Sequence, residues 1–283
     1  MLVSQIKTKF FDQLKEEYPS GEIQSFFNLL TEAYLKMSRL DLALDHGREL
    51  STAEEKMFED SLLRLLKHEP IQYIIGETEF FGLKFKVNNN VLIPRPETEE
   101  LVQWILEDFK NLKTGELSIL DIGTGSGCIA ISLAKKLPNA RVSAIDISEE
   151  ALKIATSNAK MTDVKVDFIL QDILKTTELP EKYDLIVSNP PYVRELEKKE
   201  MHRNVLENEP EMALYVKDQE PLIFYQKITK LAETGINQGG SLYFEINQYL
   251  GKETEEVLNR SGFKSFSGKD IFGNDRMLKG TKD

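Results

Sequence analysis

The chain has 283 residues, of which 41% are hydrophobic and 29% are charged, a balance typical of folded globular proteins and not of disordered ones. Its 36 basic and 47 acidic residues give a formal net charge of −11, so the chain as a whole is not attracted to nucleic acid. The single cysteine, Cys128, excludes a disulfide framework and a cysteine-rich zinc site. The three histidines, His46, His68 and His202, show no metal-ligand spacing, so we expect no metal.

The sequence contains no apolar run of the roughly 18 residues that a membrane span requires. Its first residues also lack the continuous apolar stretch of a signal peptide. We therefore expect a cytoplasmic protein that does not interact with membranes. At about 150 residues per domain, the length suggests two domains or one large one.

The first 70 residues predict helices. Apolar residues recur every three or four positions from Val3 to Tyr18 and again from Ile23 to Met37. Ser51, with Glu54 three residues later, matches the capping-box pattern and predicts the start of a third helix that runs toward Lys67. Because no catalytic motif lies here, we expect a helical bundle over residues 1–75 that is structural or holds a partner.

The middle of the chain predicts a change of structure. Residues 78–81 and 83–87, separated by Gly82, have the alternating pattern of a short β-hairpin, and we interpret residues 76–94 as a linker. Residues 95–283 then form the second domain. The charged stretch 194–209 is typical of a solvated helix or a mobile loop.

Helix and strand patterns alternate along the second domain, which favours a doubly wound α/β fold with a mostly parallel sheet. The predicted helices cover residues 97–110, 128–137, 149–161 and 220–234. The predicted strands cover residues 117–120, 142–145, 164–170, 184–188 and 241–246.

A glycine-rich motif follows the first of these strands and indicates a nucleoside cofactor. Gly123, Gly125 and Gly127, with Thr124 and Ser126 between them, connect a strand to a helix, whose free N–H groups and close backbone approach suit such a ligand. Asp146 ends the next strand about 20 residues later, where a carboxylate can accept hydrogen bonds from both ribose hydroxyls. A plain glycine turn is the less favoured interpretation.

Asp121, just before the glycines, bears on which cofactor this is. A carboxylate suits a cofactor with an amino group and a sulfonium and would repel a pyrophosphate, so S-adenosylmethionine is favoured over NAD. Asp172, after the third strand, could accept a hydrogen bond from an adenine amino group, although an isolated Asp is more often a helix cap.

Asn189-Pro190-Pro191-Tyr192 ends the fourth strand, at the edge of the sheet where ligands bind in this fold class. The prolines remove backbone donors, which leaves the Asn189 side-chain oxygen and the Pro190 carbonyl as neighbouring acceptors. Two acceptors side by side suit the two protons of an –NH2 group. Tyr192 adds a planar face for a flat amide or base.

Together, these motifs resemble the class I S-adenosylmethionine-dependent methyltransferases that modify planar nitrogens. Within that group, Leu92-Ile-Pro-Arg-Pro-Glu-Thr-Glu99 is similar to the hallmark of the protein-(glutamine-N5) methyltransferases that act on peptide chain release factors. Pro70–Gly76, Phe80-Phe81-Gly82 and Lys269–Arg276 match the same family, so the resemblance covers essentially the whole chain.

The resemblance implies a Rossmann-like methyltransferase domain whose sheet has seven strands, the last inserted antiparallel. It implies methyl transfer from S-adenosylmethionine, leaving S-adenosylhomocysteine, to the glutamine of the Gly-Gly-Gln motif of class I release factors. The enzyme would be a monomer that modifies translation termination, with a helical domain that recognises the substrate. Asp121, Gly123–Gly127, Asp146, Asp172, Ile173 and Asn189 would bind the cofactor, and Asn189, Pro190, Pro191 and Tyr192 the substrate. The catalytic residues would be Asn189, Pro190 and Tyr192.

The chain also departs from the family pattern. An aromatic residue is common where Ile173 stands, a glycine where Asn247 stands, and a Gly-Gly stretch where Tyr215–Asp218 stands. The alternative is a nucleic-acid amino-methyltransferase, acting on adenine N6 or rRNA guanine N2, with the same Asn-Pro-Pro-Tyr chemistry. A NAD-dependent dehydrogenase leaves Asn-Pro-Pro-Tyr unexplained, and an intact Asn189 argues against a non-catalytic module.

Overall fold

The fold is described from a computed structural model that covers residues 1–44, 47–110 and 117–282, so His46 lies outside the described residues. The chain divides into two compact units. Residues 1–76 and 202–208 form the first, which we call the helical unit, and residues 77–201 and 209–283 form the second, which we call the α/β unit. Among the described residues, no helix is long and apolar enough to cross a membrane.

The helical unit is built around its own apolar core. It contains α1 (Val3–Leu14), α2 (Ser20–Leu35), α3 (Arg39–Leu44), α4 (Thr52–Leu65), α5 (Ile71–Ile75) and α9 (Arg203–Asn208). The residues of the two predicted apolar patterns face inward, with Phe10 and Phe27 completely buried and in edge-to-face contact at 5.5 Å between ring centroids. The capping box is confirmed, because Ser51 Oγ accepts from Glu54 N–H at 3.3 Å and Ser51 N–H donates to the Glu54 carboxylate at 2.8 Å.

Residues 202–208 belong to the helical unit, although the sequence predicted them within the methyltransferase domain. His68 anchors them from both its side chain and its backbone. Arg203 Nη1 lies 2.9 Å from His68 Nε2, and Asn208 Nδ2 donates to the His68 carbonyl at 3.0 Å. The sequence pattern could not place this segment, because its partners lie more than a hundred positions earlier in the chain.

The predicted β-hairpin is present as β1 (Glu77–Phe80) and β2 (Leu83–Lys86), joined through Phe81 and Gly82, both with positive φ. It is part of the α/β unit and not a free linker. Phe80 and Phe85 are buried in the core of that unit, and Lys86 N–H donates to Asn158 Oδ1 at 2.8 Å.

The α/β unit contains a seven-stranded sheet in the order β10-β11-β9-β6-β3-β4-β5. These strands are β3 (Ser118–Ile122), β4 (Arg141–Asp146), β5 (Asp167–Leu170), β6 (Tyr183–Ser188), β9 (Ile236–Glu245), β10 (Lys264–Lys269) and β11 (Asp275–Thr281). Only β11, the last in sequence, runs antiparallel, and it is inserted between β9 and β10. The predicted methyltransferase topology is therefore confirmed.

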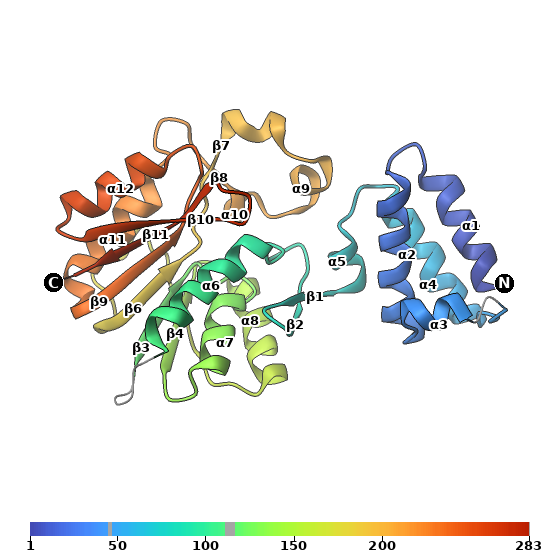
Figure 1. The fold of residues 1–283 in the computed structure, drawn as a ribbon, viewed down its shortest axis with the longest axis horizontal. Coiled ribbons are helices and arrows are strands. Elements are labelled where there is room, and N and C mark those ends of the chain that lie inside the picture. Colours follow the sequence, from blue (N-terminus) through green and yellow to red (C-terminus); the bar gives the residue numbers. More distant parts are fainter. Residues whose placement is uncertain (45–46, 111–116, 283) are drawn as a thin grey trace. The chain divides into compact units, whose positions relative to one another are not determined.

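Helices cover both faces of the sheet (Figure 1). One face carries α6 (Pro96–Phe109), α7 (Cys128–Lys136) and α8 (Glu149–Thr162), and the other carries α11 (Ile223–Gly235) and α12 (Gly251–Arg260). Side chains of each strand alternate between the two resulting cores, so that Ile119 packs into the first and Leu120 into the second. This arrangement leaves the carboxyl ends of the parallel strands free to form a site.

The remaining segment lies between β6 and α11. It contains β7 (Val193–Arg194), a 3-10 helix (Glu195–Glu200), α10 (Glu211–Leu214) and β8 (Tyr215–Val216), with β7 and β8 paired in parallel. The prediction of a solvated segment over residues 194–209 is wrong for Glu197 and Glu209, which are only 8% and 5% exposed. Each carboxylate is satisfied by an arginine and by a donor distant in sequence. Arg194 and Asn247 Nδ2 donate to Glu197, and Arg95 and Ile93 N–H donate to Glu209.

Candidate active site

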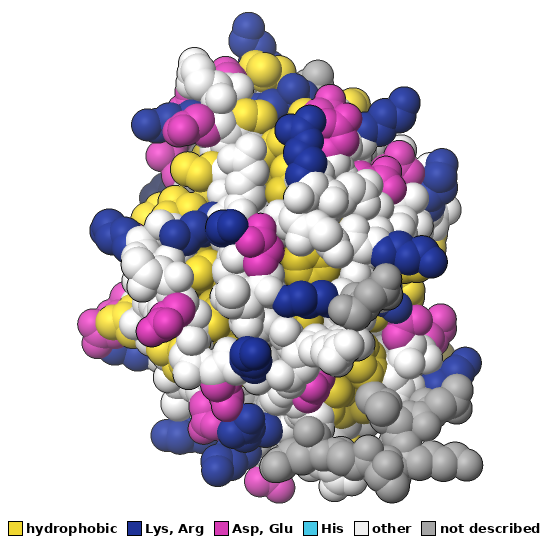
Figure 2. All heavy atoms as spheres, turned by 90° about the vertical axis from the view of Figure 1, so that its left-hand side faces the viewer, with side chains coloured by type: hydrophobic (Ala, Val, Ile, Leu, Met, Phe, Trp, Pro, Cys, Tyr) yellow, Lys and Arg dark blue, Asp and Glu magenta, His cyan; other side chains and the backbone are white. Residues whose placement is uncertain are grey.

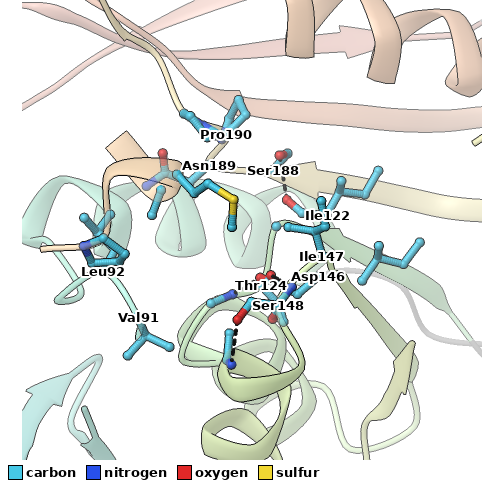
Figure 3. A pocket seen from close by; sticks show the side chains of 18 of the residues that line it. Val91, Leu92, Ile122, Thr124, Asp146, Ile147, Ser148, Ser188, Asn189 and Pro190 are labelled. Atoms are coloured by element: carbon cyan, nitrogen blue, oxygen red, sulfur yellow. Dashed lines mark hydrogen bonds between the residues drawn. The ribbon is translucent and has the colours of Figure 1, made fainter. Parts of the chain in front are cut away.

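A cavity of about 500 Å³ lies at the carboxyl ends of β3, β4 and β6. Its size is typical of sites for small ligands. In Figure 3, Thr124, Asp146 and Ser148 gather on one side of it, and Asn189 and Pro190 lie on another. Of the predicted site residues, those that line the cavity are Gly123, Thr124, Gly125, Ser126, Asp146, Asp172, Ile173, Asn189, Pro190 and Pro191.

The glycine motif forms the wall of the cavity that is closest to α7. Gly123, Gly125 and Gly127 all have positive φ, between 54° and 83°, which only glycine adopts without strain. Gly123 N–H donates to the Ile145 carbonyl at 2.8 Å, so the loop is tied to the end of β4. Gly127 does not line the cavity, and it is needed for packing instead, since an added Cβ would lie 2.8 Å from Ile131 Cδ1.

Asp121 supports this loop from behind and is not on the cavity wall, unlike the prediction from sequence. Its side chain is completely buried, and its Oδ2 accepts from Thr124 Oγ1 at 2.6 Å and from Ala130 N–H at 3.3 Å. Burial raises the pKa of this carboxyl to about 7. From its place in the sequence alone, contact of Asp121 with a ligand could not be distinguished from support of the glycine loop, which is what its bonds to Thr124 and Ala130 provide.

Asp146 and Asp172 both line the cavity. The Asp146 carboxylate accepts from Gly125 N–H at 2.8 Å and from Ser148 N–H at 2.9 Å, so it joins the glycine loop to the start of α8. Burial raises the pKa of Asp146, and these backbone bonds oppose that effect. Asp172 is closer to solvent, and an ion pair with Lys175 at 3.0 Å holds its pKa below the usual value.

The Asn-Pro-Pro-Tyr turn follows β6, as predicted, and brings Asn189 and both prolines to the cavity. Asn189 Nδ2 donates to Thr98 Oγ1 at 3.2 Å. Tyr192 is not among the residues that line the cavity, and its hydroxyl donates to Glu245 Oε1 at 2.9 Å. Burial raises the pKa of Tyr192 well above its ordinary value.

Two further walls were not assigned to the site from sequence. Leu92, Pro94, Arg95 and Thr98 come from the segment that carries the family hallmark, so that motif was the available signal. Met212 and Tyr215 come from the segment after residue 208, and no sequence pattern marked them. The buried Glu209 joins these two walls through an ion pair with Arg95 at 2.5 Å.

Two family models match the chain. The methyltransferase small domain family matches residues 101–214, and the PrmC N-terminal domain family matches residues 6–76. The fold resembles a crystal structure of a methyltransferase from Pyrococcus furiosus, with a TM-score of 0.51, 20% identity, and 79% of this chain and 98% of that chain covered.

Curated relatives match over nearly the whole chain. A release factor glutamine methyltransferase from Flavobacterium psychrophilum is 54% identical over 281 residues, which is 99% of both chains. One from Bacteroides thetaiotaomicron is 46% identical over 94% of this chain and 95% of its own length, and one from Streptococcus pneumoniae is 40% identical over 98% of each. With this similarity and the site geometry in agreement, the chain belongs to the release factor glutamine methyltransferase family.

Proposed function

We propose that this protein transfers the methyl group of S-adenosylmethionine to the side-chain amide nitrogen of the glutamine in the Gly-Gly-Gln motif of class I release factors. One observation carries the proposal. The acceptor pair formed by Asn189 and Pro190 lies on the same cavity as the glycine loop and Asp146, in a chain that belongs to the family. A nucleoside cofactor and a substrate amide can thus be held on opposite walls of one site.

The residues of the cavity fit the cofactor. When bound, S-adenosylmethionine supplies an electrophilic methyl group attached to a sulfonium. The loop from Gly123 to Ser126 would lie along it, Asp146 would accept from the ribose hydroxyls, and Asp172 would accept from the adenine amine. Ile173, 8% exposed, would contact the adenine as an apolar side chain. The proposal requires no metal.

The wall formed by Asn189 and Pro190 would position the substrate amide nitrogen, which receives the methyl group. An amide nitrogen is a poor nucleophile because its lone pair is delocalised into the carbonyl. Asn189 Oδ1 and the Pro190 carbonyl can accept one hydrogen bond each from its two protons, which turns the nitrogen lone pair toward the cofactor wall and favours pyramidalisation. The amide proton becomes acidic only once the nitrogen has been alkylated, so no general base is required before that step. Pro191 stiffens the turn.

Tyr192 would contribute differently from the prediction. Because its hydroxyl is held by Glu245 and the residue is not on the cavity wall, we propose that it anchors the turn instead of offering its ring to the substrate. Asn247 donates to the Tyr192 carbonyl at 3.0 Å and adds to this anchoring.

The substrate is a protein, and we propose that the helical unit provides a second contact to it, away from the reacting glutamine. This unit has two acid-rich stretches, residues 12–17 and 54–60, and ion pairs within the unit partly neutralise the second. Glu54 pairs with Arg48 at 2.9 Å, Glu59 pairs with Lys9 at 2.5 Å, and Glu55 pairs with the N-terminal amine at 3.1 Å. These pairs favour ordinary solvated helix faces over a dedicated acidic docking surface.

We further propose that the enzyme acts as a cytoplasmic monomer in translation termination, without binding nucleic acid itself. The net charge of −11 supports this choice over the nucleic-acid alternative. Figure 2 shows the side of the α/β unit that carries α12, where basic and acidic side chains are interspersed and not segregated by sign.

The proposal is tested by methyl transfer from labelled S-adenosylmethionine to a purified class I release factor. Label should enter the intact factor, and it should not enter a factor whose Gly-Gly-Gln glutamine is replaced. Asn189→Ala is the matched enzyme variant: its kcat should fall about 100-fold or more, whereas its affinity for S-adenosylhomocysteine should stay within about threefold. Methylation of DNA or rRNA with the release factor untouched would contradict the proposal.

A further inference from the structure

Asn189 has an orientation problem that its own chemistry does not solve. Its side chain carries an acceptor oxygen and a donor –NH2 group of nearly the same size, and a rotation of about 180° exchanges them. Only the orientation with Oδ1 toward the cavity can accept a hydrogen bond from a substrate amide. The opposite orientation would present two donors to two donors.

Thr98, a residue of α6, determines the orientation of the Asn189 side chain. Its hydroxyl donates to Glu245 Oε2 at 2.6 Å, a short bond to a completely buried side chain. Because its single proton is used in that bond, the Thr98 oxygen can only accept from Asn189, at 3.2 Å. The –NH2 group of Asn189 must therefore face Thr98, and its oxygen faces away from it.

Glu245 determines which group donates and which accepts in each of these hydrogen bonds. Its second oxygen accepts from the Tyr192 hydroxyl at 2.9 Å, so an ionised Glu245 requires both hydroxyls to donate to it. Burial raises the pKa of Glu245, whereas these two hydrogen bonds and the nearby Arg276 favour the ionised form. Thr98 is only 2% exposed and Glu245 only 1%, so water cannot readily replace either partner.

We propose that Thr98 and Glu245 are positioning residues that set the donor and acceptor polarity of Asn189 and thereby select an amide over a carboxylate at the reacting position. This inference rests on the proposed function for the identity of the substrate. Thr98 itself also lines the cavity, but its hydroxyl is turned to Glu245 and Asn189. With the polarity fixed, a glutamine finds an acceptor, and a glutamate in its place meets an oxygen that repels it.

Thr98→Val tests the proposal because it keeps the shape of the side chain and removes only the hydroxyl. Without that oxygen, Asn189 can turn over. The kcat for the release factor should fall about tenfold or more, with KM changed by less than about threefold. Thr98→Ser, which restores the hydroxyl, should recover most of the lost kcat.

Binding gives a readout that loss of stability alone would not change. In the presence of S-adenosylhomocysteine, the wild type should bind a peptide with Gly-Gly-Gln more tightly than the same peptide with Gly-Gly-Glu, and Thr98→Val should reduce that preference about fivefold or more. Thr254→Val is the matched control: Thr254 is also completely buried, and its hydroxyl donates within α12 to the Leu250 carbonyl at 2.8 Å. This control should keep both kcat and the preference.

A third measurement does not depend on methylation. In protein labelled with ¹⁵N-asparagine, the Asn189 side-chain amide signal should shift and exchange faster in Thr98→Val than in Thr254→Val. An unchanged signal together with an unchanged peptide preference would overturn the inference, and so would a Thr98→Ser enzyme as impaired as Thr98→Val. If the wild type methylates no glutamine, the proposed function fails, while the amide signal still decides whether Thr98 orients Asn189.

Discussion

The pKa of the Asp121 carboxyl depends strongly on its buried surroundings. Asp121 carries an acid in the interior of the protein, with one oxygen satisfied by Thr124 and Ala130 and the other, Oδ1, without a hydrogen-bond partner among the described residues. An isolated charge there is unfavourable, so the folded protein retains the proton far above the usual pH. The stability of the fold should therefore depend on pH through this group.

The sign follows from comparing the two states. In the unfolded chain an aspartic acid ionises near pH 4, whereas in the folded protein Asp121 ionises at about pH 7. Between these values the folded state binds the extra proton, so the free energy of unfolding falls as pH rises, by about 1.4 kcal/mol per pH unit. Asp121→Asn, which stays neutral, should gain about 2 kcal/mol relative to the wild type between pH 5 and pH 7. Urea unfolding without cofactor measures this, and a difference that is constant with pH would contradict it.

Several site residues were predictable because their chemistry is local. Asp146 ends a strand, the glycines and the Asn-Pro-Pro turn each follow one, and parallel strands bring their carboxyl ends together. Thr98 was not predicted as the partner of Asn189, nor Glu245 as the partner of Thr98, since these pairs are 91 and 147 positions apart in sequence and meet only in the folded protein. A sequence pattern shows which atoms a side chain has, and it does not show which of them are already bonded.

At the scale of elements, the glycine loop joins β3 to α7 under two separate constraints. Every glycine in it has positive φ, but only Gly127 is also closely packed, with its virtual Cβ 2.8 Å from Ile131 Cδ1 and 3.1 Å from Ala155 Cβ. An added Cβ at Gly123 would meet nothing within 4 Å. Substitutions at Gly123 and Gly127 can therefore separate the two effects, since an added Cβ at Gly123 causes backbone strain alone and one at Gly127 causes backbone strain and steric overlap.

Gly127→Ala should be more destabilising than Gly123→Ala. Both substitutions place an L side chain at positive φ, at a cost of about 1–2 kcal/mol, and only Gly127→Ala also presses a Cβ against Ile131 of α7 and Ala155 of α8, an overpacking that adds about 1–3 kcal/mol. Urea unfolding of the two variants without cofactor gives the comparison. An equal or larger loss in Gly123→Ala would show that the packing against α8 is not a constraint.

Some elements could not be predicted from the sequence, either because they bury few apolar side chains or because they are short. Helix α12 has an apolar side but buries only Thr254 and Leu258 among mostly polar residues, and the edge strand β10 exposes four of its six residues, so neither contains an apolar run. The short helices α3 and α5 are below the length at which periodicity can be recognised. By contrast, β3 is buried along its whole length, so its sequence is an apolar run that predicts a strand.

At the scale of the whole molecule, we expect removal of the helical unit to lower activity more on an intact release factor than on a short peptide. A variant that lacks residues 1–76 and carries a glycine-serine linker in place of 202–208 removes this unit completely. If the unit holds the body of the release factor, kcat/KM for the intact factor should fall at least about tenfold more than kcat/KM for a short glutamine peptide. Unchanged affinity for S-adenosylhomocysteine would establish that the α/β unit is intact, and equal losses on both substrates would indicate a purely structural role.

The place of residues 202–208 in the helical unit has a consequence for how this enzyme can be recombined. The chain enters the α/β unit at residue 77, returns to the helical unit at residue 202 and leaves it again at residue 209. The two units are therefore not consecutive modules that a single junction separates. In a chimera that takes only residues 1–76 from a relative, Arg203 and Asn208 of this protein would face the relative's residue in place of His68. The exchanged part must therefore include residues 202–208 as well, so that the contacts of these two residues with position 68 are kept.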